Sequence, residues 1–287
     1  MNFIRVLDDV YLLKTPFSTV WSGVVLIRGE KNFLIDSGAH APEKYIEPAL
    51  RSLGMSLSEV DWLLHTHAHG DHITAHREIV DRYGVKVACM DKQLANLVDP
   101  ASNAIRIRTR FPEHSPEPQS WLQGVRPDKI LREFETLEGR LTPIWTPGHD
   151  SDCVCWYDQK HKFIYTGDAI QGNGTPTQGI AFYQSLDDYL TTLRKLRMMD
   201  IHGMLFGHEY AGLGELVKGR EQVVYMLDVC LEYVRTYHKT IKEMLSYGAY
   251  SPSDMATTLI NFCGCGKPEK LFLALYTVTE HLNRLKK

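Results

Sequence analysis

The stretch Leu63-Leu64-His65-Thr66-His67-Ala68-His69-Gly70-Asp71-His72 decides how the rest of the chain is interpreted. The apolar residues from 60 to 64 predict a buried strand, and residues 73–83 predict a helix with one apolar face. The turn between this strand and this helix holds His67, His69, Asp71 and His72. In α/β proteins, ligands usually bind beyond the carboxyl ends of strands.

So many imidazoles in one turn are unfavourable without a ligand. Protonated rings repel one another, and neutral rings all require hydrogen-bond partners. A divalent metal ion removes both problems, because neutral imidazole nitrogens and carboxylate oxygens are its natural ligands. A histidine-rich surface loop is the alternative, and the aspartate interleaved at ligand spacing argues against it. The stretch therefore predicts a metal site.

The pattern His-x-His-x-Asp-His after a short apolar strand resembles the signature of the metallo-β-lactamase superfamily. Further motifs resemble elements of that family in the same order, and together they cover about residues 1–210: Leu34-Ile35-Asp36-Ser37-Gly38, Thr146-Pro147-Gly148-His149, Tyr165-Thr166-Gly167-Asp168 and Gly207-His208. Alternating strands and helices independently indicate an α/β class. The resemblance implies a four-layer αβ/βα sandwich with a helical C-terminal extension.

The resemblance also assigns the metal ligands. It implies one site formed by three histidines, which are His67, His69 and His149. It implies a second, mixed site formed by Asp71, His72 and His208. Asp168 is expected to be the carboxylate that bridges the two sites. We expect two divalent ions per chain, zinc before iron or manganese, since all three accept imidazole and carboxylate ligands. Asp36 is expected beside the ligands without being one.

Such a pair of ions holds a bridging hydroxide that attacks a carbonyl or phosphoryl centre. By resemblance, Asp71 orients this hydroxide and receives its proton. Asp168 stands where the commonest zinc β-lactamases have cysteine, and Gln171 stands where the best-known acyl-homoserine lactonases have tyrosine. His69 stands where flavodiiron proteins have glutamate. The resemblance therefore centres on the hydroxyacylglutathione hydrolase-like group and predicts a hydrolase of a small ester, thioester or lactone.

Three alternatives stay open. A phosphodiesterase would use the same site. A mononuclear iron dioxygenase acting on a persulfide shares the His-x-His-x-Asp-His start, and it would hold one iron where the hydrolase holds two metals. A signal effector would bind a metabolite at a vestigial site.

Beyond His208 the resemblance thins. Residues 1–214 are expected to form the catalytic domain and residues 215–287 a helical extension. Helical periodicity predicts one long helix over 215–247, a second over 255–262 and a third from Pro268, in segments with apolar stripes.

The run His149-Asp150-Ser151-Asp152 is similar to a run in the quinolone signal response protein, a family member with helices over its site. Its carboxylates are expected either to accept a hydrogen bond from a ligand imidazole or to face solvent. The helical extension is expected to be a lid over the site or the interface of a homodimer, and the lid is favoured.

Residues 99–123 contain four prolines and are expected to lack regular structure. Within them, Ile105-Arg106-Ile107-Arg108-Thr109-Arg110 carries three arginines. A solvated basic face is the favoured interpretation. Contact with an anionic substrate is the alternative, because the corresponding region of the resembling family lies near the mouth of the metal site.

The composition fits a soluble globular enzyme, with 44% hydrophobic and 23% charged residues among 287. A net charge of −3 argues against a nucleic-acid partner, and no apolar run reaches membrane-spanning length. The first residues lack the apolar core of a signal peptide, so a cytoplasmic protein with a small-molecule substrate is expected. The six cysteines lack Cys-x-x-Cys spacing and are expected to be reduced thiols.

Overall fold

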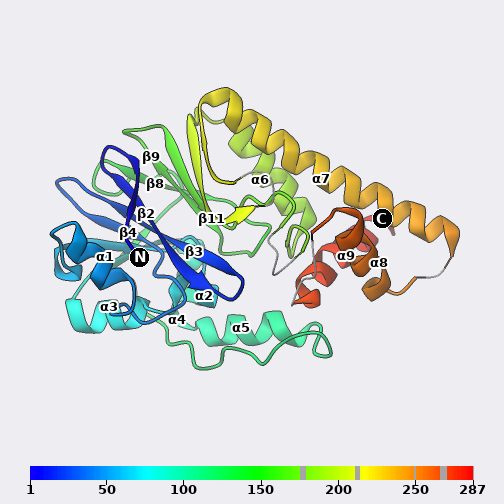
Figure 1. The fold of residues 1–287 in the computed structure, drawn as a ribbon, viewed down its shortest axis with the longest axis horizontal. Helices are drawn as coiled ribbons and strands as arrows, with labels where there is room; N and C mark the ends of the chain where they lie inside the picture. Colours follow the sequence, from blue (N-terminus) through cyan, green and yellow to red (C-terminus); the bar gives the residue numbers. More distant parts are fainter. Residues whose placement is uncertain (175–178, 211–213, 249, 266–269, 287) are drawn as a thin grey trace.

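A computed structural model describes residues 1–174, 179–210, 214–248, 250–265 and 270–286. Two β-sheets lie face to face, and helices cover the outer face of each sheet (Figure 1). The αβ/βα order of layers predicted from the sequence is therefore confirmed.

Among the described residues, the first sheet has seven strands in the order β1-β2-β3-β4-β5-β6-β7. These strands are β1 (Ile4–Leu7), β2 (Val10–Phe17), β3 (Val20–Ile27), β4 (Phe33–Ile35), β5 (Trp62–Leu64), β6 (Lys86–Met90) and β7 (Lys129–Leu131). Strands β1 to β4 pair antiparallel, whereas β4 to β7 pair parallel. Neighbouring parallel strands have their carboxyl ends at the same edge of the sheet. The segments that follow β4 and β5 therefore lie side by side at that edge.

The second sheet has the order β12-β11-β10-β9-β8. Its strands are β8 (Leu141–Trp145), β9 (Val154–Asp158), β10 (Phe163–Gly167), β11 (Gly203–Tyr210) and β12 (Gly214–Lys218). Only the β10–β11 pair is parallel among these described strands, and the other pairs are antiparallel. The residues that follow β10 therefore lie beside those at the end of β11.

Alternation along the strands explains why both faces of the first sheet are apolar. Leu12 packs between the two sheets, while the next residue, Leu13, packs under the outer helices. Val25 likewise faces the second sheet, and Val24 faces the helices. Successive side chains of a strand point to opposite faces, so a sheet covered on both sides needs apolar residues at every position.

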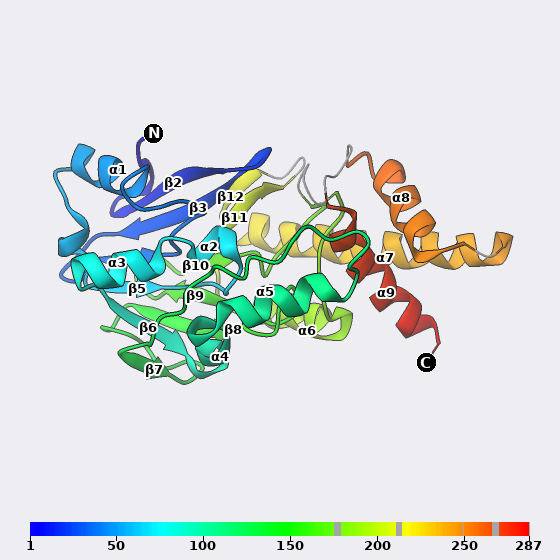
Figure 2. The ribbon, with the colours of Figure 1, turned by 90° about the horizontal axis from the view of Figure 1, so that it is seen from below.

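The helices divide between the two outer faces and one end of the sandwich (Figure 2). Before the second sheet the chain forms α1 (Ile46–Ser52), α2 (Gly70–Ile73), α3 (His76–Tyr83), α4 (Leu94–Val98) and α5 (Pro100–Thr109), with short 3-10 turns η1 (Leu57–Glu59) and η2 (Asp91–Gln93). Later it forms α6 (Leu186–Met198), α7 (Arg220–Tyr247), α8 (Pro252–Phe262) and α9 (Leu271–Leu285). Within the described ranges, no helix is both long enough and apolar enough to span a bilayer.

The expectation that residues 99–123 lack regular structure is wrong at its start, because α5 lies there. Pro100 occupies the first turn of this helix, where the missing N–H is no disadvantage. The Asp99 side chain accepts a hydrogen bond from the backbone N–H of Ser102 and so caps the helix. The proline expected to break the regular structure instead begins a helix.

The long C-terminal helix also starts later than predicted. Residues 215–218 belong to β12, where Val217 pairs with Met204 of β11, and α7 begins only at Arg220. The helix predicted over 73–83 begins later, at His76, as α3, and Ile73 is the last residue of the short helix α2. Pro268 lies outside the described residues.

One apolar cluster joins the second sheet to the C-terminal helices. It contains Ile164 from β10, Leu193 from α6, Leu227 from α7 and Leu275 from α9. The predicted division into residues 1–214 and 215–287 stays a prediction, and it falls within β12, a strand that is hydrogen-bonded to β11.

Candidate metal centre

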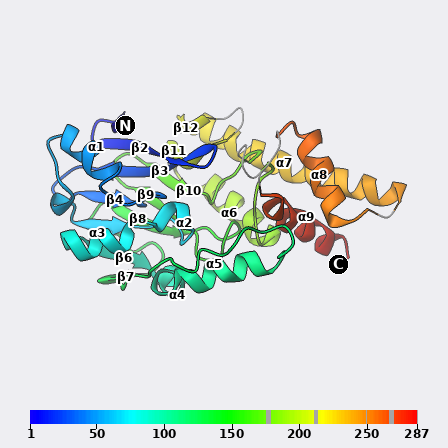
Figure 3. The same cartoon turned by 60° about the horizontal axis from the view of Figure 1, so that its bottom comes forward.

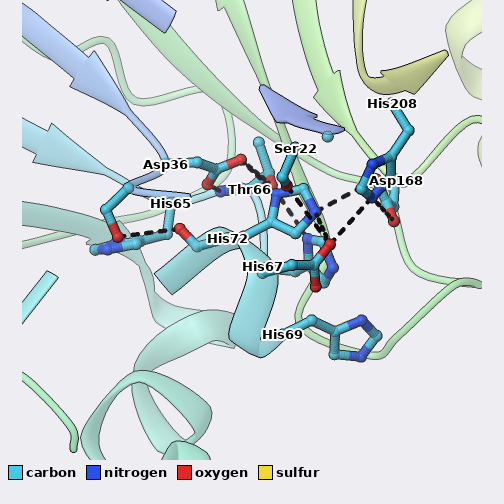
Figure 4. A network of polar contacts seen from close by, with 12 residues as sticks. Ser22, Asp36, His65, Thr66, His67, His69, His72, Asp168 and His208 are labelled. Atoms are coloured by element: carbon cyan, nitrogen blue, oxygen red, sulfur yellow. Dashed lines mark hydrogen bonds and ion pairs between the residues drawn. The ribbon is translucent and has the colours of Figure 1, made fainter. Parts of the chain in front are cut away.

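Four strand ends bring the predicted ligands to one edge of the sandwich. His67 follows β5, Asp168 follows β10 and His208 lies near the end of β11. His149 follows β8 after a Pro-Gly turn. Figure 4 shows the side chains of His67, His72, Asp168 and His208 converging on a common region.

The seven residues predicted as ligands fall into three overlapping groups. In each group the ligand atoms lie within 4.8 Å of one another, and the groups are His67–His69–His149, His67–His72–Asp168 and Asp71–His72–His208. The first and third groups coincide with the two predicted ligand sets, and their assignment as ligands stays a prediction.

Asp168 lies between the two sets. Its Oδ2 atom is 3.6 Å from Nε2 of His149 and 3.3 Å from Nε2 of His208. Its Oδ1 atom is 3.5 Å from Nε2 of His72. A carboxylate whose oxygens face both sets is placed to bridge two cations.

Each of the five imidazoles is anchored through one ring nitrogen. Nδ1 of His72 donates to Asp36 at 2.8 Å, and Nδ1 of His208 donates to the Trp21 carbonyl at 2.6 Å. The remaining anchors are Thr66 Oγ1 for His67 at 3.1 Å, the Phe182 carbonyl for His149 at 3.0 Å and Asp150 for Nε2 of His69 at 3.1 Å. The second nitrogen of every ring then carries a lone pair directed into the cluster.

These lone pairs show that the residues fit a metal. Nδ1 of His69 and Nε2 of His149 face each other at 3.0 Å although both rings use their proton elsewhere. Nε2 of His67, Nε2 of His72 and Oδ1 of Asp168 are buried without a hydrogen-bond partner among the described residues. Buried acceptors that converge in this way need a cation, since unpaired buried polar atoms are strongly destabilising.

The electrostatics of the two sets differ. Burial and the neighbouring histidines lower the pKa of His67 well below its usual value, and burial with His69 lowers the pKa of His149 to about 4. In the mixed set, burial opposes ionisation, yet His72 and His208 hold the pKa of Asp71 and of Asp168 below its usual value. His67 and His149 are therefore neutral, and Asp71 and Asp168 are ionised, which are the forms in which imidazole and carboxylate bind a metal ion.

Asp36 supports the turn in a strained backbone conformation. Its φ is 61°, in the left-handed region that a non-glycine residue rarely adopts. Its carboxylate accepts hydrogen bonds from the backbone N–H and Oγ1 of Thr66, both at 2.8 Å, and from His72. The strain is offset by three bonds that lock the metal-binding turn. The structure thus places Asp36 where the sequence predicted it, beside a ligand.

Gly207 allows β11 to approach the ligands closely. A Cβ at this position would lie 2.6 Å from Oδ1 of Asp168 and 2.9 Å from the ring of His72. Any side chain here would displace the cluster, which explains the glycine that precedes His208.

The carboxylates after His149 face the protein interior. Asp150 is buried and binds His69, and it also accepts hydrogen bonds from Nδ2 of Asn103 at 3.1 Å and from Arg106 at 3.0 Å. Asp152 is also buried and accepts from the backbone N–H of Ala68. Of the two sequence interpretations, the hydrogen bond to a ligand imidazole is confirmed for Asp150, and exposure to solvent is wrong for both residues.

Sequence reasoning missed the backbone anchors and the walls of the site. The carbonyls of Trp21 and Phe182 orient two ligands, but a backbone carbonyl leaves no mark on the sequence. A recess above the ligands has mixed walls that include Phe17, Ile107, Arg108, Phe182 and Phe272. The last of these comes from α9, so the C-terminal helices contribute to the recess.

Comparisons with known proteins identify the family. The model of the metallo-beta-lactamase superfamily matches residues 16–208. The chain belongs to this superfamily. A metallo-beta-lactamase family protein from Thermus thermophilus has the same fold, with a TM-score of 0.76 over 98% of this chain and 95% of that one, at 21% identity.

Two curated relatives extend the comparison. A beta-lactamase-like protein 2 homolog of Drosophila melanogaster is 25% identical over 90% of this chain and 80% of its own length. An atrochrysone carboxyl ACP thioesterase of Paecilomyces divaricatus is 28% identical over 60% of this chain. The chain spans only 45% of the length of that thioesterase.

Proposed function

We propose that this protein is a dinuclear metal-dependent hydrolase that cleaves a small ester, thioester or lactone, with thioesters as the leading class. The observation that carries the proposal is the set of five imidazoles, each anchored through one nitrogen and each directing the other into a cluster with two carboxylates. The thioesterase among the relatives supports the choice of thioesters.

The residues fit two divalent ions, zinc before iron or manganese. When bound, such ions activate water as a nucleophile at neutral pH and polarise the carbonyl oxygen. His67, His69 and His149 would hold one ion, Asp71, His72 and His208 the other, and Asp168 would span the two.

The chain itself supplies a proton acceptor. The Asp71 carboxylate lines the recess beside His208, with Oδ2 3.1 Å from Nε2 of that ring, and so would accept the proton of the attacking water. Asp168 reaches the same recess, but its Oδ atoms lie between the two histidine sets. Asp71 is thus the proposed catalytic carboxylate.

Hydrolysis of a substrate panel tests the proposal. Protein stripped with a chelator should lose thioester hydrolysis and recover it on addition of zinc, manganese or iron. Phosphodiester and persulfide substrates in the same panel separate the alternative activities. Hydrolysis that persists in protein shown to be metal-free would overturn the metal-dependent mechanism.

We also propose that the C-terminal helices act as a lid that selects substrates. Phe272 of α9 is buried in one apolar cluster with Phe182, whose carbonyl anchors His149, and both side chains line the recess. Phe272→Ala should retain the metals and change the preference between short and long acyl groups. An unchanged substrate range would contradict the lid and favour the interface of a homodimer. A cytoplasmic location and the absence of nucleic-acid and membrane partners stay predictions.

A further inference from the structure

Three arginines on or next to α5 have different partners. Arg106 pairs with the buried Asp150 at 3.0 Å, and Arg110 pairs with Glu280 at 3.5 Å and lies over the ring of Tyr276. Arg108 has no carboxylate within ion-pair distance among the described residues. Two of the three charges are thus neutralised by the protein, and the third is not.

The guanidinium of Arg108 is held in place by neutral groups. One terminal nitrogen donates to the Ala104 carbonyl at 3.3 Å and the other donates to Oε1 of Gln119 at 3.2 Å. Its Nε atom is buried without a partner in the described part of the chain. Burial lowers the pKa of Arg108, yet a guanidinium keeps its charge in proteins. A guanidinium that is partly buried, held in place and left with an unused N–H donor is unfavourable unless an anion binds to it.

The position of this cation links it to the metal centre. Arg108 lines the same recess as Asp71 and Asp168, and Gln119 packs directly on Gly70 in the ligand turn. Figure 3 shows α5 extending from below α2 toward α9. A molecule whose reacting carbonyl lies at the ligands can therefore place a second group against Arg108.

The surroundings favour an oxyanion attached to an apolar stem. Phe17, Ile107 and Phe272 line the recess together with Arg108, and Lys270 adds a second basic side chain at 4.7 Å over the ring of Phe17. A planar guanidinium binds carboxylate and phosphate oxygens with two parallel hydrogen bonds, whereas aromatic and aliphatic walls accept methylene groups.

We propose that Arg108 forms an oxyanion subsite and that the substrate carries a carboxylate or phosphate group that binds there. This inference rests on the proposed thioester hydrolysis and names the substrate class for it. The anion belongs either to the acyl group, as a terminal carboxylate, or to the thiol, as a phosphate. The carbon–sulfur bond cleaved is the same in both cases.

Four matched probes distinguish these sources. The metal-loaded protein is assayed with three thioesters: pentanoyl-N-acetylcysteamine, which is neutral, glutaryl-N-acetylcysteamine, which has an acyl carboxylate, and pentanoyl-coenzyme A, which has phosphates on the thiol. The fourth probe, glutaryl-coenzyme A, carries both anions. We expect kcat/KM for one of the singly anionic thioesters to exceed that for the neutral one by about 10- to 100-fold.

Variants of the arginines assign this preference to a residue. Arg108→Gln should abolish the preference, because kcat/KM for the preferred anionic thioester should fall to the level of the neutral one. Arg108→Lys, which keeps the charge and loses the planar fork, should retain part of it. Arg110→Gln is the matched control and should retain all of it, because Arg110 is already paired with Glu280. Unchanged metal content and melting temperature confirm that the variants are folded.

Binding of the reaction products separates failure of this inference from failure of the proposed function. Calorimetry compares glutarate with pentanoate and coenzyme A with N-acetylcysteamine, and requires no hydrolysis. If no thioester is cleaved, the proposed function fails. The subsite is still supported in that case if glutarate binds more tightly than pentanoate, or coenzyme A more tightly than N-acetylcysteamine, and if Arg108→Gln removes the difference. The subsite would be overturned by equal affinity within both pairs of products, or by a preference for the anionic thioester that persists in Arg108→Gln. It would also be overturned if Arg108→Gln lowered kcat/KM for the neutral and the anionic thioester equally.

Discussion

The metal centre and the cluster of His281, His238 and Tyr183 both bring histidine side chains together, and their partners differ. In the second cluster, Nε2 of His281 is 2.6 Å from the Tyr183 hydroxyl and Nδ1 is 3.3 Å from Nδ1 of His238. Both ring nitrogens of His281 are thus occupied within the protein. No ion pair joins His281 or His238 to a carboxylate in the described part of the chain.

The pKa values reflect this difference. Burial, His238 and Arg284 lower the pKa of His281 to about 3, so the ring is neutral. His208 is also buried, yet Asp168 and Asp71 raise its pKa to about 10. The comparison teaches that clustered histidines alone do not make a metal site. Interleaved carboxylates and ring nitrogens without protein partners make one.

Removal of the bridging carboxylate should have the largest effect. Asp168→Ala leaves two cations facing each other without the charge between them, so at least one metal should be lost and kcat should fall by at least about 100-fold. Elemental analysis and thioester hydrolysis measure the two effects. The control is His281→Gln, which should keep both metals because the second cluster holds none. A fully active Asp168→Ala with two metals would show that the ligand assignment is wrong.

Loss of an anchor should have a smaller effect. Asp150→Asn weakens the hydrogen bond that orients His69 and removes the charge that Arg106 neutralises. Metal affinity should fall by about 10- to 100-fold, as for other partners of ligating histidines. Competition with a chelator measures this affinity. Asp228→Asn, which breaks an exposed pair with Arg197, is the control and should have no effect. Equal affinity in both variants would contradict the anchoring role of Asp150.

The neutral histidine of the second cluster should give a modest dependence of stability on pH. The pKa of His281 is about 3 when folded and about 6.5 when unfolded, so between these values the unfolded chain binds more protons. Its contribution is complete above pH 6.5 and is lost as pH falls toward 3. Between pH 7 and pH 5 this amounts to about 2 kcal/mol of unfolding free energy. Urea unfolding at both values should show a smaller loss in His281→Gln, and an equal loss in variant and wild type would contradict it.

The fold is predicted correctly because five short motifs resemble those of the metallo-β-lactamase superfamily. Apolar strands that end near His67, His149, Asp168 and His208 place these residues at one edge of the sandwich. The anchors could not be predicted in the same way. The Trp21 carbonyl reaches His208 across 187 positions of sequence, and such pairings depend on how the two sheets pack.

Two local errors have a similar origin. Pro100 is predicted as a helix breaker, although a proline in the first turn after a capping aspartate begins a helix. Glu215 to Lys218 have residues that suit a helix, yet an open hydrogen-bonding edge of β11 makes them a strand. Tertiary pairing overrides propensity where a sheet edge is available. The role of Arg108 is also invisible in sequence, because its two neighbouring arginines differ from it only in their partners.

The number of metal ions per chain tests the central claim most directly. Elemental analysis of the purified full-length protein should find two divalent ions per chain, one for each ligand set, with zinc as the expected metal. One iron per chain, without a second metal on reconstitution, would contradict the dinuclear hydrolase and favour the mononuclear dioxygenase.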